Sequence, residues 1–242
     1  MPATITLVLE RYVLSAFFLF LGWRQLEPIG SQLEAVGAPG AVLAYAVPRL
    51  VQHVLVLVFN LQVAGLLVLS RKPTVPPRSA KDVLVPLASN FFYLAYNLGS
   101  LAPAALTRNL VPAAWRLPAS ALALYLSLAG FGLAVWAVAH LGRSFGVLVA
   151  VRPVVTSGPY RHVRHPIYSS YLVQMGALLA AYGSPLVLGL VAVYLAVLVW
   201  RARLEEARLR EHSPEYRAYA AQTPFLFPRL ATGSRPPTVG GR

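Results

Sequence analysis

The sequence predicts an all-α integral membrane protein with about six transmembrane helices, the last two forming a helical hairpin that leads into a cytoplasmic helical segment. Of its 242 residues, 57% are apolar and only 12% are charged, whereas about 25% of the residues in an average soluble domain carry a charge. So few charged side chains cannot cover a surface that faces water. Several apolar stretches also reach the length of about 20 residues that a helix needs to cross a bilayer.

The first four predicted spans are apolar stretches at residues 4–23, 51–69, 83–106 and 117–139. The first contains Glu10 and Arg11. Charges inside a span are suspected of a function by default, but here an interfacial position or pairing with each other is expected. The second span is expected to be entered through Pro48 and Arg49, after a loop over residues 24–50 that is nearly neutral in charge.

The uncharged run over residues 166–200 is too long for one ordinary span. The sequence "YGSP" interrupts it near the middle with turn-forming residues, which predicts two short helices joined by a tight turn. Beyond Trp200, strong helix formers in "RARLEEARLREH" predict that the last helix continues into water. Ser213 followed by Pro214 has the pattern of an N-cap and a first helical residue, so another short helix is expected there.

The distribution of basic residues predicts the orientation in the membrane. With six spans, the basic loops 70–82 and 140–165 and the Arg-rich C-terminus all fall on one side. Because positively charged loops face the cytoplasm, both termini are predicted to be cytoplasmic. The final residues, 231–242, have the composition of a disordered tail.

The net charge of +13 is explained by Arg residues that face anionic lipid headgroups, and we expect no nucleic-acid binding. The absence of cysteine excludes disulfides, thiolate metal sites and cysteine nucleophiles. His162 and His165 have an H-x-x-H spacing. They lack evident further ligands, and Arg161 and Arg164 would repel a cation, so no metal site is expected.

The hairpin brings two polar elements to one membrane face. His165, before the first arm, and Glu205, after the second, should therefore be neighbours. Gly158 and Pro159 set a turn whose backbone can approach a ligand closely. Pro166 suits the first position of the next helix, whose free N–H groups attract an anion. The acid pair that begins at Glu205 would attract an ammonium or sulfonium cation, so the site suits a zwitterionic, amino-acid-like ligand.

Three segments share a pattern with a known family. "GPYRHVRHPIY" fits G-x-Y-x-x-x-R-H-P-x-Y before a hairpin, "RARLEE" supplies a Glu pair, and "PEYRAYAAQTPFLFP" supplies E-Y-x-x-Y and a Pro-containing end. Over roughly residues 140–230, the chain resembles the isoprenylcysteine carboxyl methyltransferase family and the related membrane phospholipid methyltransferases. The matching positions are Gly158, Tyr160, Arg164, His165, Pro166, Tyr168, Glu205, Glu206, Glu215, Tyr216, Tyr219, Pro224 and Pro228.

The resemblance implies an S-adenosylmethionine-dependent methyltransferase whose lipophilic acceptor enters from the bilayer. It implies one transmembrane methyltransferase domain over residues 1–230, with its cofactor-binding part in 140–230. The candidate catalytic residues are Arg164 and Arg201, on the acceptor side, and Glu206, for which a role as a solvated helix residue is equally open. The implied cofactor-binding residues are Gly158, Tyr160, His165, Pro166, Tyr168 and Glu205.

The acceptor is less well defined, because the chain departs from the family on that side. Phe225 follows the Pro of "TP", where relatives often have a basic residue, and "HSP" at 212–214 replaces the usual Phe-Gly. The abundance of Arg favours an isoprenylcysteine-like or other lipid carboxylate, and a phospholipid amine stays open. Two other classes also stay open: an NADPH-dependent membrane enzyme similar to sterol reductases, and a non-catalytic lipid-binding protein whose Arg- and His-rich loop contacts headgroups.

Overall fold

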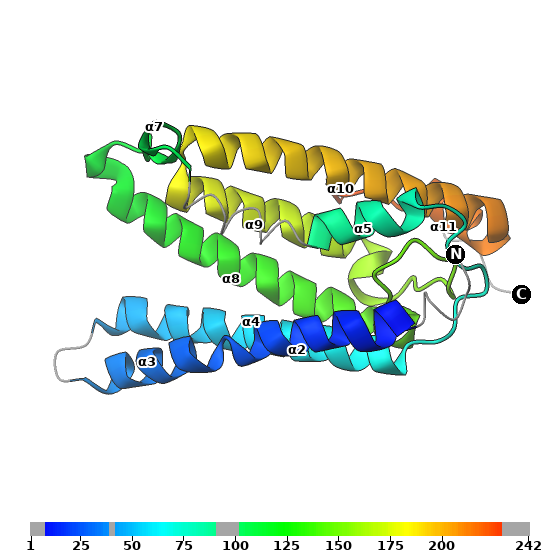
Figure 1. Ribbon diagram of the computed structural model, residues 1–242, viewed down its shortest axis with the longest axis horizontal. Helices are drawn as coiled ribbons and strands as arrows, with labels where there is room; N and C mark the ends of the chain where they lie inside the picture. Colours follow the sequence, from blue (N-terminus) through cyan, green and yellow to red (C-terminus); the bar gives the residue numbers. More distant parts are fainter. Residues whose placement is uncertain (1–7, 39–41, 91–101, 229–242) are drawn as a thin grey trace, which may run out of the picture.

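The computed structural model describes residues 8–38, 42–90 and 102–228, and in these ranges the chain is a helical bundle without a β-strand. Figure 1 shows two layers of helices that run along the long axis. Three helices, long and apolar enough to cross a membrane, include residues Leu43–Leu69, Ala113–Ser144 and Pro185–His212. The predicted class, an all-α membrane protein, is therefore confirmed, whereas six spans and their orientation stay predictions.

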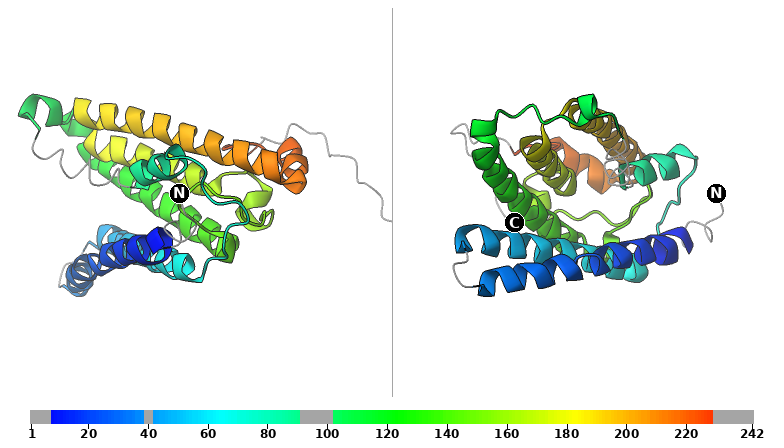
Figure 2. Two further views of the ribbon diagram at one scale, coloured as in Figure 1. Left: turned by 45° about the vertical axis from the view of Figure 1, so that its right-hand side comes forward. Right: turned by 60° about the vertical axis from the view of Figure 1, so that its left-hand side comes forward.

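One layer contains the N-terminal helices. The π-helix η1 (Leu9–Leu14) continues directly into α2 (Ser15–Trp23), and α3 (Leu26–Gly37) follows it. The long helix α4 (Leu43–Leu69) returns antiparallel and packs against both α2 and α3. In Figure 2 this layer lies on one side of the bundle, where α4 packs against α8.

Two expectations for this layer are wrong. Residues 26–37 form a helix where a loop was expected. Ile29, Gln32 and Val36 recur at helical spacing and are half-buried on this helix, which packs on α4. Helix α4 begins at Leu43 and contains Pro48, which was expected to precede it. Proline is tolerated inside membrane helices when neighbouring groups satisfy the freed carbonyl.

The second layer contains α8 (Arg116–Leu141), α9 (Pro166–Tyr182) and α10 (Pro185–His212). Helix α8 runs diagonally between α4 and α9 and packs on both (Figure 1). Two short helices, α5 (Lys81–Asn90) and α7 (Ala104–Thr107), lie against α10. The middle of the predicted third span, 91–101, lies outside the described residues, as does the predicted tail at 231–242.

The predicted hairpin is confirmed. Helix α9 ends at Tyr182 and α10 begins at Pro185, where the Ser184 hydroxyl caps the new helix by accepting from the Val187 N–H. The 28 residues of α10 correspond to about 42 Å at the α-helical rise, more than the roughly 30 Å of a bilayer core. The helix is therefore longer than one crossing requires, and the extension of its last turns into water stays a prediction.

The short helix α11 (Pro214–Gln222) confirms the predicted start signal. The Ser213 hydroxyl accepts a hydrogen bond from the Tyr216 N–H, and Pro214 is the first helical residue. The cap turns the chain back towards the loop between α8 and α9, at the right-hand end of the bundle in Figure 1. The predicted site residues gather at this end.

Candidate active site

The loop before α9 and the C-terminal segment are joined by their backbones. The N–H groups of Arg164 and His165 donate to the carbonyls of Pro224 and Phe225, at 2.8 and 3.2 Å. The imidazole of His165 stacks on Tyr168, with ring centroids 5.1 Å apart and planes 5° from parallel. Phe225 contacts the same imidazole edge-on at 5.0 Å. Phe225, which departs from the family pattern, thus closes one side of His165.

Glu206 ties together the loop, α10 and α11. One carboxylate oxygen accepts hydrogen bonds from Arg164 Nε at 2.6 Å and from the Tyr216 hydroxyl at 3.2 Å, and His165 Nε2 lies 3.2 Å from it. The other oxygen accepts from Arg210 at 3.2 Å. Arg164 continues the network by donating to two backbone carbonyls at the end of α11. Arg164 and Glu206 are therefore placed to hold the C-terminal segment against the loop.

Glu205 belongs to a different network. Its Oε1 accepts hydrogen bonds from the Tyr168 hydroxyl and, at 3.0 Å, from Arg201 Nε. Arg201 also donates to Ser89 Oγ and to the Val147 carbonyl, each at 2.8 Å. Its guanidinium lies 5.4 Å from the centroid of the Tyr168 ring. Arg201 is thus enclosed by α5, α9, α10 and the loop.

A cavity of about 160 Å³ lies between these two networks. Its volume is below the roughly 300–1,000 Å³ of whole small-molecule sites, so it suits one polar end of an elongated ligand. Seven of the nine predicted site residues line it, while Glu206 and Gly158 do not. The seven are Tyr160, Arg164, His165, Pro166, Tyr168, Arg201 and Glu205.

Gly158 acts on the site through the backbone. Its φ of +58° lies in the left-handed region, and a Cβ at this position would lie 2.2 Å from the ring of His140. A side chain at residue 158 would therefore clash and strain the turn. Glycine is required here to place Tyr160 at the cavity.

Two polar atoms at the cavity have no partner within the described residues. The Tyr160 hydroxyl is buried without a hydrogen bond, and burial raises the pKa of this phenol, so it remains a proton donor. Both hydrogen bonds to Glu205 go to Oε1, which leaves Oε2 without one in the described part of the chain. Buried polar groups are normally satisfied, so the Tyr160 hydroxyl is suited to contact a ligand. Glu205 Oε2 belongs to a side chain that is 23% exposed and is open to a ligand in the cavity.

The first helix supplies an unexpected support for the cavity wall. Glu10, 1% exposed, accepts hydrogen bonds from the N–H groups of Val147 and Leu148, at 2.9 and 2.8 Å. Its other oxygen pairs with Arg152 at 2.6 Å. Of the two alternatives expected for Glu10, pairing with Arg11 is therefore wrong, and an interfacial position stays a prediction. The presence of Glu10 in an apolar span indicated a special role for this residue, but the sequence alone did not identify Arg152 as its partner.

A second ion pair fastens the same wall from α5. The Asp82 carboxylate pairs with Arg208 at 2.6 Å and accepts from the backbone N–H groups of Arg78 and Ser79. The Val149 N–H donates to the Asp82 carbonyl at 3.0 Å. Burial alone would raise the pKa of Asp82, but the hydrogen bonds from Arg208, Arg78 and Ser79 outweigh it and lower the pKa below its usual 3.8.

The Asp82 contribution to stability should depend on pH. Because the fold lowers the pKa of this carboxyl, its stabilisation is present above about pH 4 and is lost as the pH falls further. We expect Asp82→Asn to lower the unfolding midpoint in detergent at pH 7 and to differ less from wild type at pH 3. Glu34→Gln, at an exposed site on α3, is the control. A difference from wild type that stays constant between pH 7 and pH 3 would contradict this role.

The fold and the site define an all-α membrane protein with a cavity, lined by both polar and apolar residues, at the base of a helical hairpin. Residues 122–211 match the model of the isoprenylcysteine carboxyl methyltransferase (ICMT) family, so this part of the chain is similar to that family. The match includes the hairpin and both glutamates, and it confirms the resemblance seen in the sequence.

Two curated relatives are similar over parts of their length. The chain is 35% identical to the cobalt-zinc-cadmium resistance protein CzcN of Cupriavidus metallidurans over 118 residues, which are 46% of this chain and 52% of the relative. It is 36% identical to the nickel-cobalt-cadmium resistance protein NccN of Alcaligenes xylosoxydans xylosoxydans over 83 residues, 32% of this chain and 37% of the relative. The chain thus spans about half or less of these relatives.

Proposed function

We propose that this protein is an S-adenosylmethionine-dependent methyltransferase that modifies a lipophilic acceptor at the membrane interface. The observation that carries the proposal is the pair of unpartnered polar atoms, Tyr160 Oη and Glu205 Oε2, at one cavity beside the start of α9. The family match supports the methyltransferase class. The positive-inside pattern supports a site on the cytoplasmic side, with six spans in one domain.

The residues at the cavity suit the amino-acid end of this cofactor. Glu205 would hold the ammonium group, the Tyr160 hydroxyl would donate to an oxygen, and the free N–H groups of α9 after Pro166 would face the carboxylate. When bound, S-adenosylmethionine supplies a methyl group on a sulfonium sulfur. Arg201 and Tyr168 then fix Glu205 in place, so that little reorganisation is needed during the reaction.

The charge pairing favours a carboxylate acceptor over an amine. An amine must lose a proton before it accepts a methyl group, and this requires a base. Glu205 is paired with Arg201, and Glu206 with Arg164 and Arg210. Neither carboxylate is therefore free to take up the proton of an amine. A lipid carboxylate, isoprenylcysteine-like or other, is already ionised and needs only to be oriented.

The printed names of the two relatives refer to metal resistance. Among the described residues, no group of three or more His, Asp or Glu side chains could hold a metal ion. Nothing in this site therefore favours metal binding by the chain itself.

Binding of the demethylated cofactor tests the proposal. We expect purified protein to bind S-adenosylhomocysteine in calorimetry and not to bind NADPH. Tyr160→Phe, which removes only the hydroxyl, should weaken binding about 3- to 10-fold, the effect of one neutral hydrogen bond. Tyr125→Phe, at a residue 57% exposed on α8, should bind like wild type. Saturable NADPH binding without S-adenosylhomocysteine binding would instead support the reductase alternative.

Transfer of labelled methyl groups into a lipid extract distinguishes the two acceptor classes. Methyl esters of carboxylates release volatile methanol after treatment with base, and methylated amines do not. We expect base-labile label. Label that resists base would overturn the carboxylate acceptor while leaving the cofactor proposal intact.

A further inference from the structure

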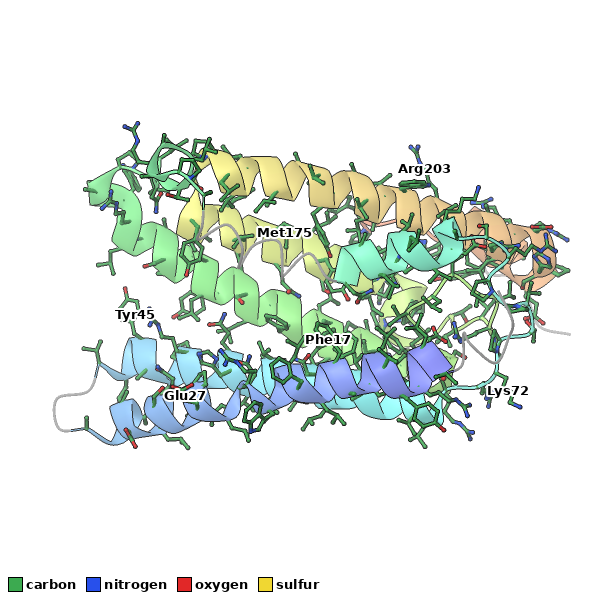
Figure 3. All side chains as sticks on the ribbon, viewed as in Figure 1. Phe17, Glu27, Tyr45, Lys72, Met175 and Arg203 are labelled. Carbon is green, nitrogen blue, oxygen red and sulfur yellow. The ribbon has the colours of Figure 1, made fainter. Side chains whose placement is uncertain are left out.

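A second and larger cavity, of about 960 Å³, lies between the N-terminal layer and helices α8 and α9. Phe17 of α2 and Met175 of α9, both labelled in Figure 3, lie on opposite sides of it. The cavity extends towards the end of the bundle opposite to the candidate active site. Its volume is at the upper end of the range for small-molecule sites, about 300–1,000 Å³.

One end of this cavity is basic. Arg24 follows α2, and Arg49 and His53 lie in the first half of α4. Among the described lining residues there is no Asp or Glu. Within the same described part of the chain, neither guanidinium has a hydrogen-bond or ion-pair partner. His53 Nδ1 lies 3.0 Å from Gln25 Oε1, which fixes the ring beside the two arginines.

The other end is mainly apolar and aromatic. Its walls include Phe17, Phe59, Phe131 and Met175, and Phe59 contacts Phe131 edge-on across the boundary between α4 and α8, with centroids 6.2 Å apart. Gln174 lines the same cavity, and its buried Nε2 has no hydrogen-bond partner within the described residues. The cavity therefore combines a basic mouth with an apolar interior.

This combination defines the chemistry of an occupant. Guanidinium groups pair with phosphate or carboxylate oxygens in strong, often bidentate hydrogen bonds. Aromatic and thioether side chains accommodate an alkyl or isoprenoid chain. A neutral or cationic head would leave the arginines unpaired, and a small free anion would leave the apolar walls empty.

We propose that this second cavity binds an anionic lipid, with its phosphate or carboxylate head at Arg24, Arg49 and His53 and its chain among Phe17, Phe59 and Phe131. The site is distinct from the methyl-donor cavity and does not depend on the proposed methyl transfer. Asn90 and Tyr171 line both cavities, so the bound chain would end beside the candidate active site.

Lipid binding to paired variants tests this proposal. Protein purified in a neutral detergent is titrated with dioleoyl phosphatidylglycerol, and bound lipid is counted by native mass spectrometry. We expect the double variant Arg24→Gln/Arg49→Gln to lose at least tenfold in affinity. The matched control is Arg108→Gln/Arg116→Gln, which removes two exposed arginines that do not line the cavity. It should bind like wild type.

Three further measurements distinguish binding of the anionic head from binding of the lipid chain and from binding of free phosphate. Dioleoyl phosphatidylcholine should bind at least tenfold more weakly than phosphatidylglycerol, and inorganic phosphate should not compete at millimolar concentration. Phe131→Ala, in the apolar wall, should weaken phosphatidylglycerol binding while the unfolding midpoint shows that the protein is folded. Equal loss in both arginine pairs, equal binding of phosphatidylcholine, or full competition by phosphate would each overturn the proposal. None of these measurements uses S-adenosylhomocysteine. Failure of the lipid-binding proposal is therefore distinguishable from failure of the methyltransferase proposal.

Discussion

Glu10→Gln is expected to destabilise the protein by about 3–5 kcal/mol, the usual cost of removing one partner from a buried ion pair. Its partner Arg152 is 7% exposed and would remain buried without a counter-charge. The amide would also be a weaker acceptor for the N–H groups of Val147 and Leu148. Because these residues form the cavity wall, S-adenosylhomocysteine affinity should fall together with the unfolding free energy measured in detergent.

Two variants make this prediction specific. Glu27→Gln changes the same side chain at an exposed site on α3 and should have an effect below about 0.5 kcal/mol. In the double variant Glu10→Gln/Arg152→Gln, the loss should be smaller than the sum of the two single losses, because the uncompensated charge is removed. If Glu10→Gln is no more destabilising than Glu27→Gln, the buried pair has no structural role.

Glu206→Gln is the second variant with a large expected effect. Hydrogen bonds to charged groups contribute about 1.5–3 kcal/mol each, and this carboxylate connects Arg164, His165 and Tyr216. Its loss should loosen α11 from the loop, so amide hydrogen exchange over residues 214–222 should accelerate. S-adenosylhomocysteine affinity should fall about tenfold, because Arg164 and His165 line the donor cavity.

The control is Glu215→Gln, an exposed acid in the first turn of α11. It removes a charge of the same sign from α11 itself without touching the network, and hydrogen exchange should change little. Unchanged exchange over α11 in Glu206→Gln would show that Arg164 and the backbone contacts hold this helix by themselves. A loss of affinity without faster exchange would instead indicate direct contact between Glu206 and the ligand.

Local signals predicted the hairpin end of the site well. The sequence "YGSP" located the turn between α9 and α10, and Ser213-Pro214 located the start of α11, because turn and cap preferences act over a few residues. The hairpin then placed His165 and Glu205 at one cavity. The same signals missed α3, which lies within the segment 24–50 that was expected to be a loop.

Contacts between distant parts of the chain were not predictable in this way. Nothing near Glu10 in the sequence specifies Arg152, because their pairing depends on how the N-terminal layer packs against the loop between α8 and α9. The different contacts made by the neighbouring residues Glu205 and Glu206 were not predictable either. Glu205 faces the cavity and Glu206 faces away because successive helical residues point about 100° apart.

The Glu10–Arg152 pair also constrains the order of assembly during synthesis. The two residues are separated by 142 positions, so at about 5–20 residues per second the first helix exists for roughly 7–28 s before its partner is made. During that interval the Glu10 carboxylate lacks the Arg152 guanidinium with which it pairs in the finished protein. The first helix can enter the membrane early, but its ion pair with Arg152 can form only after the loop beyond α8 has been synthesised. A nascent chain arrested before Arg152 should therefore expose its first helix to protease or to exchange between membrane and water, and release of the arrest should protect it.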